Sequence, residues 1–99
     1  MKIAVPLFRK RVSPHFGSSS RILLLETKGE EICQETIWDL GGEGPVEIAR
    51  RLVALGVEEL ICGGIQSHYK DWLIGKGVRV VDNQRGVARE IVQDLLLII

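Results

Sequence analysis

The sequence carries no excess of either charge and contains few cysteines. Thirteen basic and thirteen acidic side chains cancel to a formal net charge of zero. A chain without net charge exerts no general attraction on nucleic acids or anionic membranes, so any electrostatic attraction must be local. The two cysteines, Cys33 and Cys62, form no CxxC motif. The chain therefore cannot build a four-cysteine zinc site or hold a cluster through four thiolates of its own.

Long hydrophobic runs are also missing. The longest, at residues 22–25 and 95–99, are far shorter than the roughly 20 residues that span a bilayer. Basic residues at 9–11 interrupt the N-terminal apolar run, which is unlike a signal peptide. We therefore predict a cytoplasmic protein without membrane or nucleic-acid partners. The apolar residues 95–99 leave three roles open: completing the core, packing in a homodimer, or marking the cut end of a longer chain.

The chain is short enough for a single domain over residues 1–99. Its hydrophobic pattern predicts strands at 1–7, 22–27, 31–38, 57–62 and 78–81. Pro45 and Gly56 bound the first predicted helix. A second helix is expected at 67–76 with Tyr69, Trp72 and Leu73 facing inward. A third is expected to start at a cap on Asp82 or Asn83 and to carry Val87, Ile91 and Leu95 at i,i+4 spacing. The turn at 28–30 predicts a hairpin, and the poorly alternating segment 31–38 predicts an edge strand.

This order of elements predicts an α/β fold with a ribonuclease H-like core. Because β-α-β crossovers are right-handed, the favoured sheet is mixed and five-stranded, in the order 3-2-1-4-5, with strand 2 antiparallel and helices on both faces. The first and fourth strands are then neighbours, and the loops that follow them open at the same edge. Cys33 would lie roughly 14 Å from the fourth strand, which excludes an intramolecular disulfide and leaves both thiols reduced.

Two glycine-bearing loops follow those neighbouring strands. Ser13-Pro14-His15-Phe16-Gly17 follows the first, and Cys62-Gly63-Gly64 follows the fourth. Ligands of α/β sheets bind in the crevice at this edge, and an imidazole beside a thiol suits a soft metal or an iron-sulfur species. The helix that begins after Cys62 predicts a lowered thiol pKa. Alternatively, His15 is a loop histidine bonded to backbone and Cys62 a small core hydrophobe.

Five segments, spread over essentially the whole chain, resemble a known family. They are residues 1–6 (MKIAVP), 12–17 (VSPHFG), 41–45 (GGEGP), 61–65 (ICGGI) and 76–80 (KGVRV). In this order they are similar to the dinitrogenase iron-molybdenum cofactor biosynthesis family, of the NifX/NifB C-terminal-like type. The resemblance implies a small ribonuclease H-like, nitrogenase accessory-like domain that carries or inserts iron-sulfur or iron-molybdenum cofactor precursors, with His15 as a candidate ligand. Many relatives have Gly-Pro-Arg where this chain has Gln66-Ser67-His68.

The predicted site residues come from the two loops and the first turn of the following helix. His15 and Cys62 are the candidate metal ligands, and no catalytic residue is expected. His68 can reach the same crevice from the helix, although an exposed surface histidine is the alternative. The full set of candidate cofactor-binding residues is Ser13, His15, Phe16, Gly17, Cys62, Gly63, Gly64 and His68.

Three classes of function remain open. The favoured one is a non-enzymatic carrier that binds an iron-sulfur or iron-molybdenum cluster transiently and exchanges it with donor or acceptor proteins, with homodimerisation possible. The second is a regulatory module that binds a small molecule or anion through backbone N–H groups at 63–67 and the basic residues at 9–11 and 21. The third, a nuclease, needs several converging carboxylates. The sequence supplies only Glu26 and Asp82 for such a site, and they lie at the ends of different predicted strands. The nuclease is therefore the least favoured class.

Overall fold

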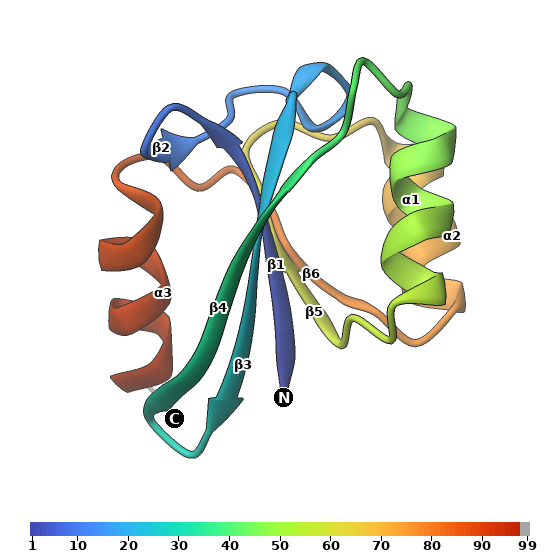
Figure 1. Cartoon of the computed structure of the whole chain (residues 1–99). Helices are drawn as coiled ribbons and strands as arrows, with labels where there is room; N and C mark the ends of the chain where they lie inside the picture. The colour runs from blue at the N-terminus through green and yellow to red at the C-terminus, as the bar shows by residue number, and fades with distance from the viewer. Residues whose placement is uncertain (98–99) are drawn as a thin grey trace.

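The computed structural model describes residues 1–97 and shows a mixed sheet with helices on both faces (Figure 1). Helices α1 and α2 cover one face, and α3 covers the other. The elements of the described residues are β1 Lys2–Phe8, β2 Arg11–Val12, η1 Phe16–Ser18, β3 Arg21–Lys28, β4 Glu31–Asp39, α1 Pro45–Ala54, β5 Glu59–Ile61, α2 Ser67–Gly75, β6 Arg79–Val81 and α3 Ala88–Leu97.

The sheet follows the path β4-β3-β1-β5-β6, and β2 pairs with β1 off this path. Strand β3 is antiparallel to both of its neighbours, whereas β1, β5 and β6 are parallel. The predicted mixed α/β fold is confirmed. The prediction of five strands is wrong, because the sheet has six strands. The additional strand, β2, pairs only Val12 and Arg11 with the end of β1, which is too short a segment to leave a periodic pattern in the sequence.

Two apolar layers hold the helices against the sheet. Successive side chains of a strand point to opposite faces, so the buried strand β1 supplies both layers. Ala4 packs in the layer under α1 and α2, with Leu52 and Leu73. Ile3 and Val5 pack in the layer under α3. Strand β1 is therefore apolar on both sides, because helices cover both faces of the sheet at this central strand.

Several predicted boundaries are corrected by the structure. Helix α3 begins at Ala88 and not beside Asp82 or Asn83, because Asn83 adopts a positive φ of 58° and its N–H donates to the Gly63 carbonyl. Residues 82–87 therefore form a loop. The buried side chains of α3 are those of Ala88, Val92 and Leu96, and Ile91 and Leu95 are half-buried against the same apolar layer. The inward face of the helix therefore includes these two positions of the apolar stripe and the residues that follow them. Leu97 is 67% exposed, and the last two residues of the apolar segment 95–99 lie outside the described residues.

Helix α2 faces the core through a narrower stripe than predicted. Leu73 is fully buried, Tyr69 is half-buried, and Trp72 is 39% exposed. Helix α1 carries Pro45 in its first turn as expected. None of the helices in residues 1–97 is long and apolar enough to cross a bilayer.

The predicted hairpin and edge strand are both present. Gly29 turns the chain between β3 and β4 with a φ of 61°, a conformation that favours glycine. Strand β4 lies at the edge of the sheet, and the register with β3 shifts near Cys33. Cys33 is exposed and Cys62 is buried, and both are free.

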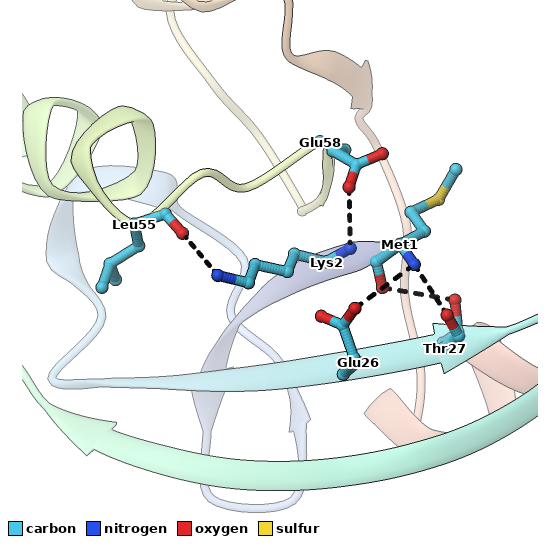
Figure 2. A network of polar contacts seen from close by, with 6 residues as sticks. All are labelled: Met1, Lys2, Glu26, Thr27, Leu55 and Glu58. Carbon is cyan, nitrogen blue, oxygen red and sulfur yellow. Dashed lines mark hydrogen bonds and ion pairs between the residues drawn. The ribbon is translucent and has the colours of Figure 1, made fainter.

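Polar contacts fix the end of the sheet where β1 begins (Figure 2). The Met1 ammonium donates to the Thr27 carbonyl at 2.6 Å, which ties the first residue to β3. The Lys2 ammonium donates to the Leu55 carbonyl at 3.1 Å, where a cation interacts favourably with the C-terminal end of α1. This end of the sheet is therefore occupied by structural contacts, and the opposite end is formed by loops.

Neighbouring residues of α2 give a direct test of this packing. We expect Leu73→Ala to lower the free energy of unfolding by about 2–5 kcal/mol, because it removes a fully buried side chain. Ile74→Ala is the matched control on the same helix, since Ile74 is 51% exposed, and it should change the stability by less than about 0.5 kcal/mol. Urea unfolding followed by circular dichroism measures both. Equal losses for the two variants would contradict the described orientation of α2.

Candidate functional site

The loops after β1 and β5 are joined by backbone hydrogen bonds at the edge of the sheet. His15 and Gly64 form an isolated parallel bridge. The Phe16 N–H donates to the Gly64 carbonyl at 2.9 Å, and the Gly64 N–H donates to the Pro14 carbonyl at 2.7 Å. The structure thus brings together the two glycine-bearing loops that the sequence singles out.

Close backbone approach explains the glycines of these loops. A Cβ atom on Gly63 would lie 2.4 Å from the Ser13 carbonyl oxygen and 2.9 Å from that of Pro14. At Gly17 it would lie 3.0 Å from a carbon of the Pro45 ring at the start of α1. Ser13 itself is buried, and its hydroxyl donates to the His15 carbonyl at 3.1 Å. These predicted site residues therefore shape the loops by packing.

His15 is exposed at the junction of two hollows. His15 and Gly64 line both of them. The first, which we call the aromatic hollow, has a volume of about 600 Å³ and is lined by His15, Phe16, Gly17, Ser18, Pro45, Gly64, Ile65, Gln66 and Tyr69. The second, the arginine groove, has a volume of about 780 Å³ and is lined by Arg11, Val12, Pro14, His15, Gly63, Gly64, Asn83, Gln84, Arg85 and Gly86. His15 is therefore within reach of a ligand in either hollow.

The arginine groove is cationic. Arg11 on β2 and Arg85 in the loop after β6 are both exposed, and neither forms an ion pair with any residue from 1 to 97. The loop is held in place because the Gln84 N–H donates to the Cys62 carbonyl at 3.0 Å. The sequence pattern predicts a helix start at Asp82 or Asn83, and it therefore does not indicate that Arg85 lies in a loop beside this groove. The glycine at 86, which has a φ of 126°, is the signal that could have indicated a loop.

The aromatic hollow adjoins the start of α2. Phe16 is buried beneath it, with its ring 6.4 Å from that of the half-buried Tyr69. Gln66 precedes the helix and no side chain caps the free N–H groups of its first turn. Such a helix N-terminus attracts negative charge. His68 does not join His15, because it lines a different groove between α1 and α2, where its ring lies tilted against that of Tyr69 with the centroids 3.9 Å apart.

Cys62 lies in the core and lines neither hollow. It is fully buried in the apolar layer under α1 and α2. Burial raises the pKa of its thiol to about 12, and the charge of Asp82 adds to this increase while Lys70 partly opposes it. The predicted lowering of this pKa is wrong, because desolvation outweighs the favourable field of the following helix. In this conformation the thiol is a protonated core group.

Other potential metal ligands do not gather around His15. Within residues 1–97, no three histidine, cysteine or acidic side chains are placed to hold one metal ion together. The two carboxylates considered for a nuclease are far apart in the fold. Glu26 pairs with the Met1 ammonium at the end of the sheet where β1 begins, whereas Asp82 pairs with Lys70 at the loop end.

The chain belongs to the family described as dinitrogenase iron-molybdenum cofactor, whose model matches residues 1–97. The resemblance seen in the sequence is thereby confirmed. Membership associates the chain with iron-molybdenum cofactor biosynthesis or binding. No curated protein is similar enough in sequence to count as a match.

Solved structures share the fold at low sequence identity. The crystal structure of PH0822 superposes with a TM-score of 0.91 at 19% identity, covering 97% of this chain and 88% of that one. A crystal structure of MJ0327 from Methanocaldococcus jannaschii, a proposed dinitrogenase, gives 0.78 at 15% identity with coverage of 98% and 88%. TM1290 from Thermotoga, a proposed NifB protein, gives 0.72 at 21% identity with coverage of 95% and 85%. At these identities the structures establish the fold alone.

The close approach at Gly63 leads to a stability prediction. Gly63→Ala should lower the free energy of unfolding by about 2–3 kcal/mol, because the new methyl group meets backbone carbonyls that cannot move aside freely. Gly75→Ala is the control, since a Cβ there has no neighbour within 4 Å, and it should raise the stability by roughly 0.5–1 kcal/mol. Thermal and urea unfolding give both values. An unchanged stability of Gly63→Ala would show that the loops are not packed as described.

The two thiols should differ sharply in reactivity. Iodoacetamide at pH 8 should modify Cys33 in the folded protein and leave Cys62 unmodified, because the thiolate is the reactive form and Cys62 is both buried and protonated. Mass spectrometry of the labelled peptides measures each site separately. In urea both thiols should react. Labelling of Cys62 in the folded protein at a rate near that of Cys33 would contradict its placement in the core.

Proposed function

We propose that the protein is a non-enzymatic carrier that binds an iron-sulfur or iron-molybdenum cluster, or its precursor, transiently at His15. Family membership supports the class of cargo. One observation carries the choice of residue: His15 is exposed at the junction of two open hollows, one of which is lined by two arginines that form no ion pair within residues 1–97. The volumes of the two hollows, about 600 and 780 Å³, lie in the range of small-molecule sites and are large enough for a cluster.

The chemistry of the site suits an anionic cargo that must later leave. Imidazole is a common ligand of iron, and Arg11 and Arg85 stabilise the negative charge of sulfide-containing clusters. A single imidazole leaves most of the coordination to solvent, added thiols, a second chain or the protein that delivers the cluster. Incomplete ligation by the carrier permits transfer, because few bonds have to break.

Cys62 is the second candidate ligand, and its use requires a rearrangement. It precedes Gly63 directly, so the thiol is only one residue away from the arginine groove. To bind iron it would have to leave the core and lose its proton, and its pKa of about 12 opposes that loss. We therefore assign the first contact with the cargo to His15 and regard Cys62 as a ligand that engages only after the loop opens.

The proposal also covers the partners of the carrier, its cellular compartment and its fold. Its partners would be cluster donor or acceptor proteins, or a second copy of the chain, and not nucleic acid or a membrane. Two free thiols are typical of proteins that work in the reducing cytoplasm. The strand path β4-β3-β1-β5-β6 follows the expected order once β2 is set aside, which supports a ribonuclease H-like core.

An anion-binding regulatory module is the second candidate function. The observation that favours it is the start of α2, where no side chain caps the helix beside the aromatic hollow. A ligand carboxylate or phosphate could accept hydrogen bonds from the N–H groups of that first turn. This candidate needs neither His15 nor a metal, so the experiment on metal uptake distinguishes the two.

Anaerobic reconstitution with iron and sulfide tests the carrier. We expect stoichiometric uptake of cluster by the unaltered chain, measured by iron and sulfide content and by the visible absorption spectrum. His15→Ala should lower the affinity of the chain for the cluster by about tenfold or more. Loss of a residue that only orients a metal ligand already costs about tenfold, and loss of the ligand itself should cost at least as much. His68→Ala is the matched control, because this exposed histidine lines a different groove and should leave uptake unchanged.

Two Cys62 variants complete the design. Cys62→Ala and Cys62→Ser should weaken retention of the cluster after its uptake if the loop opens, and should leave uptake unchanged if the thiol stays in the core. No uptake by the unaltered chain, or uptake to which His15→Ala is indifferent, would refute the carrier at this site. Circular dichroism of each variant excludes loss of folding as the cause.

A further inference from the structure

A third hollow lies at the same edge of the sheet, between the end of β1 and the start of β3. It has a volume of about 410 Å³, and we call it the β1–β3 pocket. It is lined by Leu7, Phe8, Arg9, Ser18, Ser20 and Arg21. Leu7 and Arg21 are opposite one another in the antiparallel register, so the two sides of this pocket are fixed by strand pairing. The pocket shares Ser18 with the aromatic hollow and no residue with the arginine groove.

Arginine and serine supply all the polar side chains that line this pocket. Arg9 and Arg21 are exposed, and neither forms an ion pair or a side-chain hydrogen bond within the part of the chain that the structure describes. No acidic side chain lines the pocket. Asp39, the cross-strand neighbour of Arg21, accepts a hydrogen bond from the Gly41 N–H at 2.9 Å. Arg9 and Arg21 thus line one pocket and form no ion pair within residues 1–97, and Asp39 on β4 is the acidic residue opposite Arg21.

The two hydroxyls are available as further donors. The Ser18 hydroxyl is exposed and has a long contact of 3.4 Å with the His15 carbonyl, which it can exchange for a better acceptor. Ser20 is exposed, and its side chain has no hydrogen bond to residues 1–97. Guanidinium forks together with hydroxyl groups match the geometry of a phosphoryl group, which accepts several hydrogen bonds at once.

An aromatic ring flanks these donors. Phe8 ends β1 and is 58% exposed, although it belongs to a strand whose preceding residues are buried. The Arg9 guanidinium lies 5.6 Å from the centroid of the Phe8 ring. Arg9 lies in the turn that connects β1 to its antiparallel partner β2 and has a φ of 59°. The chain thus places an arginine and a phenylalanine side by side at the mouth of the pocket.

We propose that the β1–β3 pocket binds a phosphorylated small molecule with a flat ring, of the nucleoside monophosphate class. Arg9, Arg21 and the two serine hydroxyls bind the phosphoryl group, and the ring lies against Phe8. The volume of the pocket lies within the range of small-molecule sites. This site shares Ser18 with the aromatic hollow but does not depend on the carrier function, because none of its side chains is a proposed metal ligand.

Calorimetric titration with AMP tests the proposal. We expect AMP to bind, adenosine to show no binding at the same concentrations, and inorganic phosphate to compete with AMP. Arg21→Gln and Arg9→Asn should each weaken AMP binding by about tenfold or more, since each removes a charge-assisted contact. Asparagine is chosen at position 9 because it tolerates a positive φ. Phe8→Ala should weaken AMP more than it weakens inorganic phosphate.

A matched control separates this site from general charge attraction. Arg79→Gln removes an exposed arginine at the start of β6, away from the pocket, and should leave AMP binding unchanged. The proposal would be overturned if Arg79→Gln weakened AMP binding as much as Arg21→Gln does. It would also be overturned if Arg9→Asn and Arg21→Gln left AMP binding intact, or if the unaltered chain did not bind AMP. Preferential binding of a short oligoribonucleotide over AMP would overturn it as well, because it would indicate a nucleic-acid surface. Iron uptake by the same variants reports on the carrier function independently.

Discussion

The site depends on one close contact between backbones. The loops after β1 and β5 can exchange hydrogen bonds only because residue 63 has no side chain, since a Cβ atom there would meet the Ser13 carbonyl oxygen at 2.4 Å. These bonds set the position of His15 relative to Gly64, and both hollows that contain His15 follow from it. The steric constraint at Gly63 thus connects the sequence of the loop to the shape of the surface.

Much of the fold could be predicted from residue patterns, because burial on one or two faces leaves a periodic trace. The apolar β1 segment, the Gly29 hairpin and the start of α1 at Pro45 are examples. The two-residue strand β2 could not be predicted, since its pairing is decided by the position of β1. The loop at 82–87 was missed for a related reason. Asn83 is a good helix cap in isolation, but its N–H is bonded to Gly63, a contact between distant segments.

The candidate site was predictable in its location and less so in its chemistry. Strand order alone brings the loops of His15 and Cys62 to one edge, whereas the state of a thiol depends on how completely its neighbours exclude water. The layer under α1 and α2 buries Cys62 fully, so its pKa rises despite the nearby start of α2. Arg85 illustrates the complementary case, in which a surface residue lines the groove because its loop is tied to the Cys62 carbonyl.

The edge strand β4 also restricts how copies of the chain can associate. Its nine residues carry acidic side chains at Glu31, Glu35 and Asp39 and no basic one. If two copies paired antiparallel about Glu35, Glu31 would face Asp39, so like charges would oppose each other at both ends of the pairing, whereas Glu35 already forms an ion pair with Arg89. Natural sheets use such charges to discourage edge-to-edge growth. Pairing of two copies through β4 in this register is accordingly disfavoured.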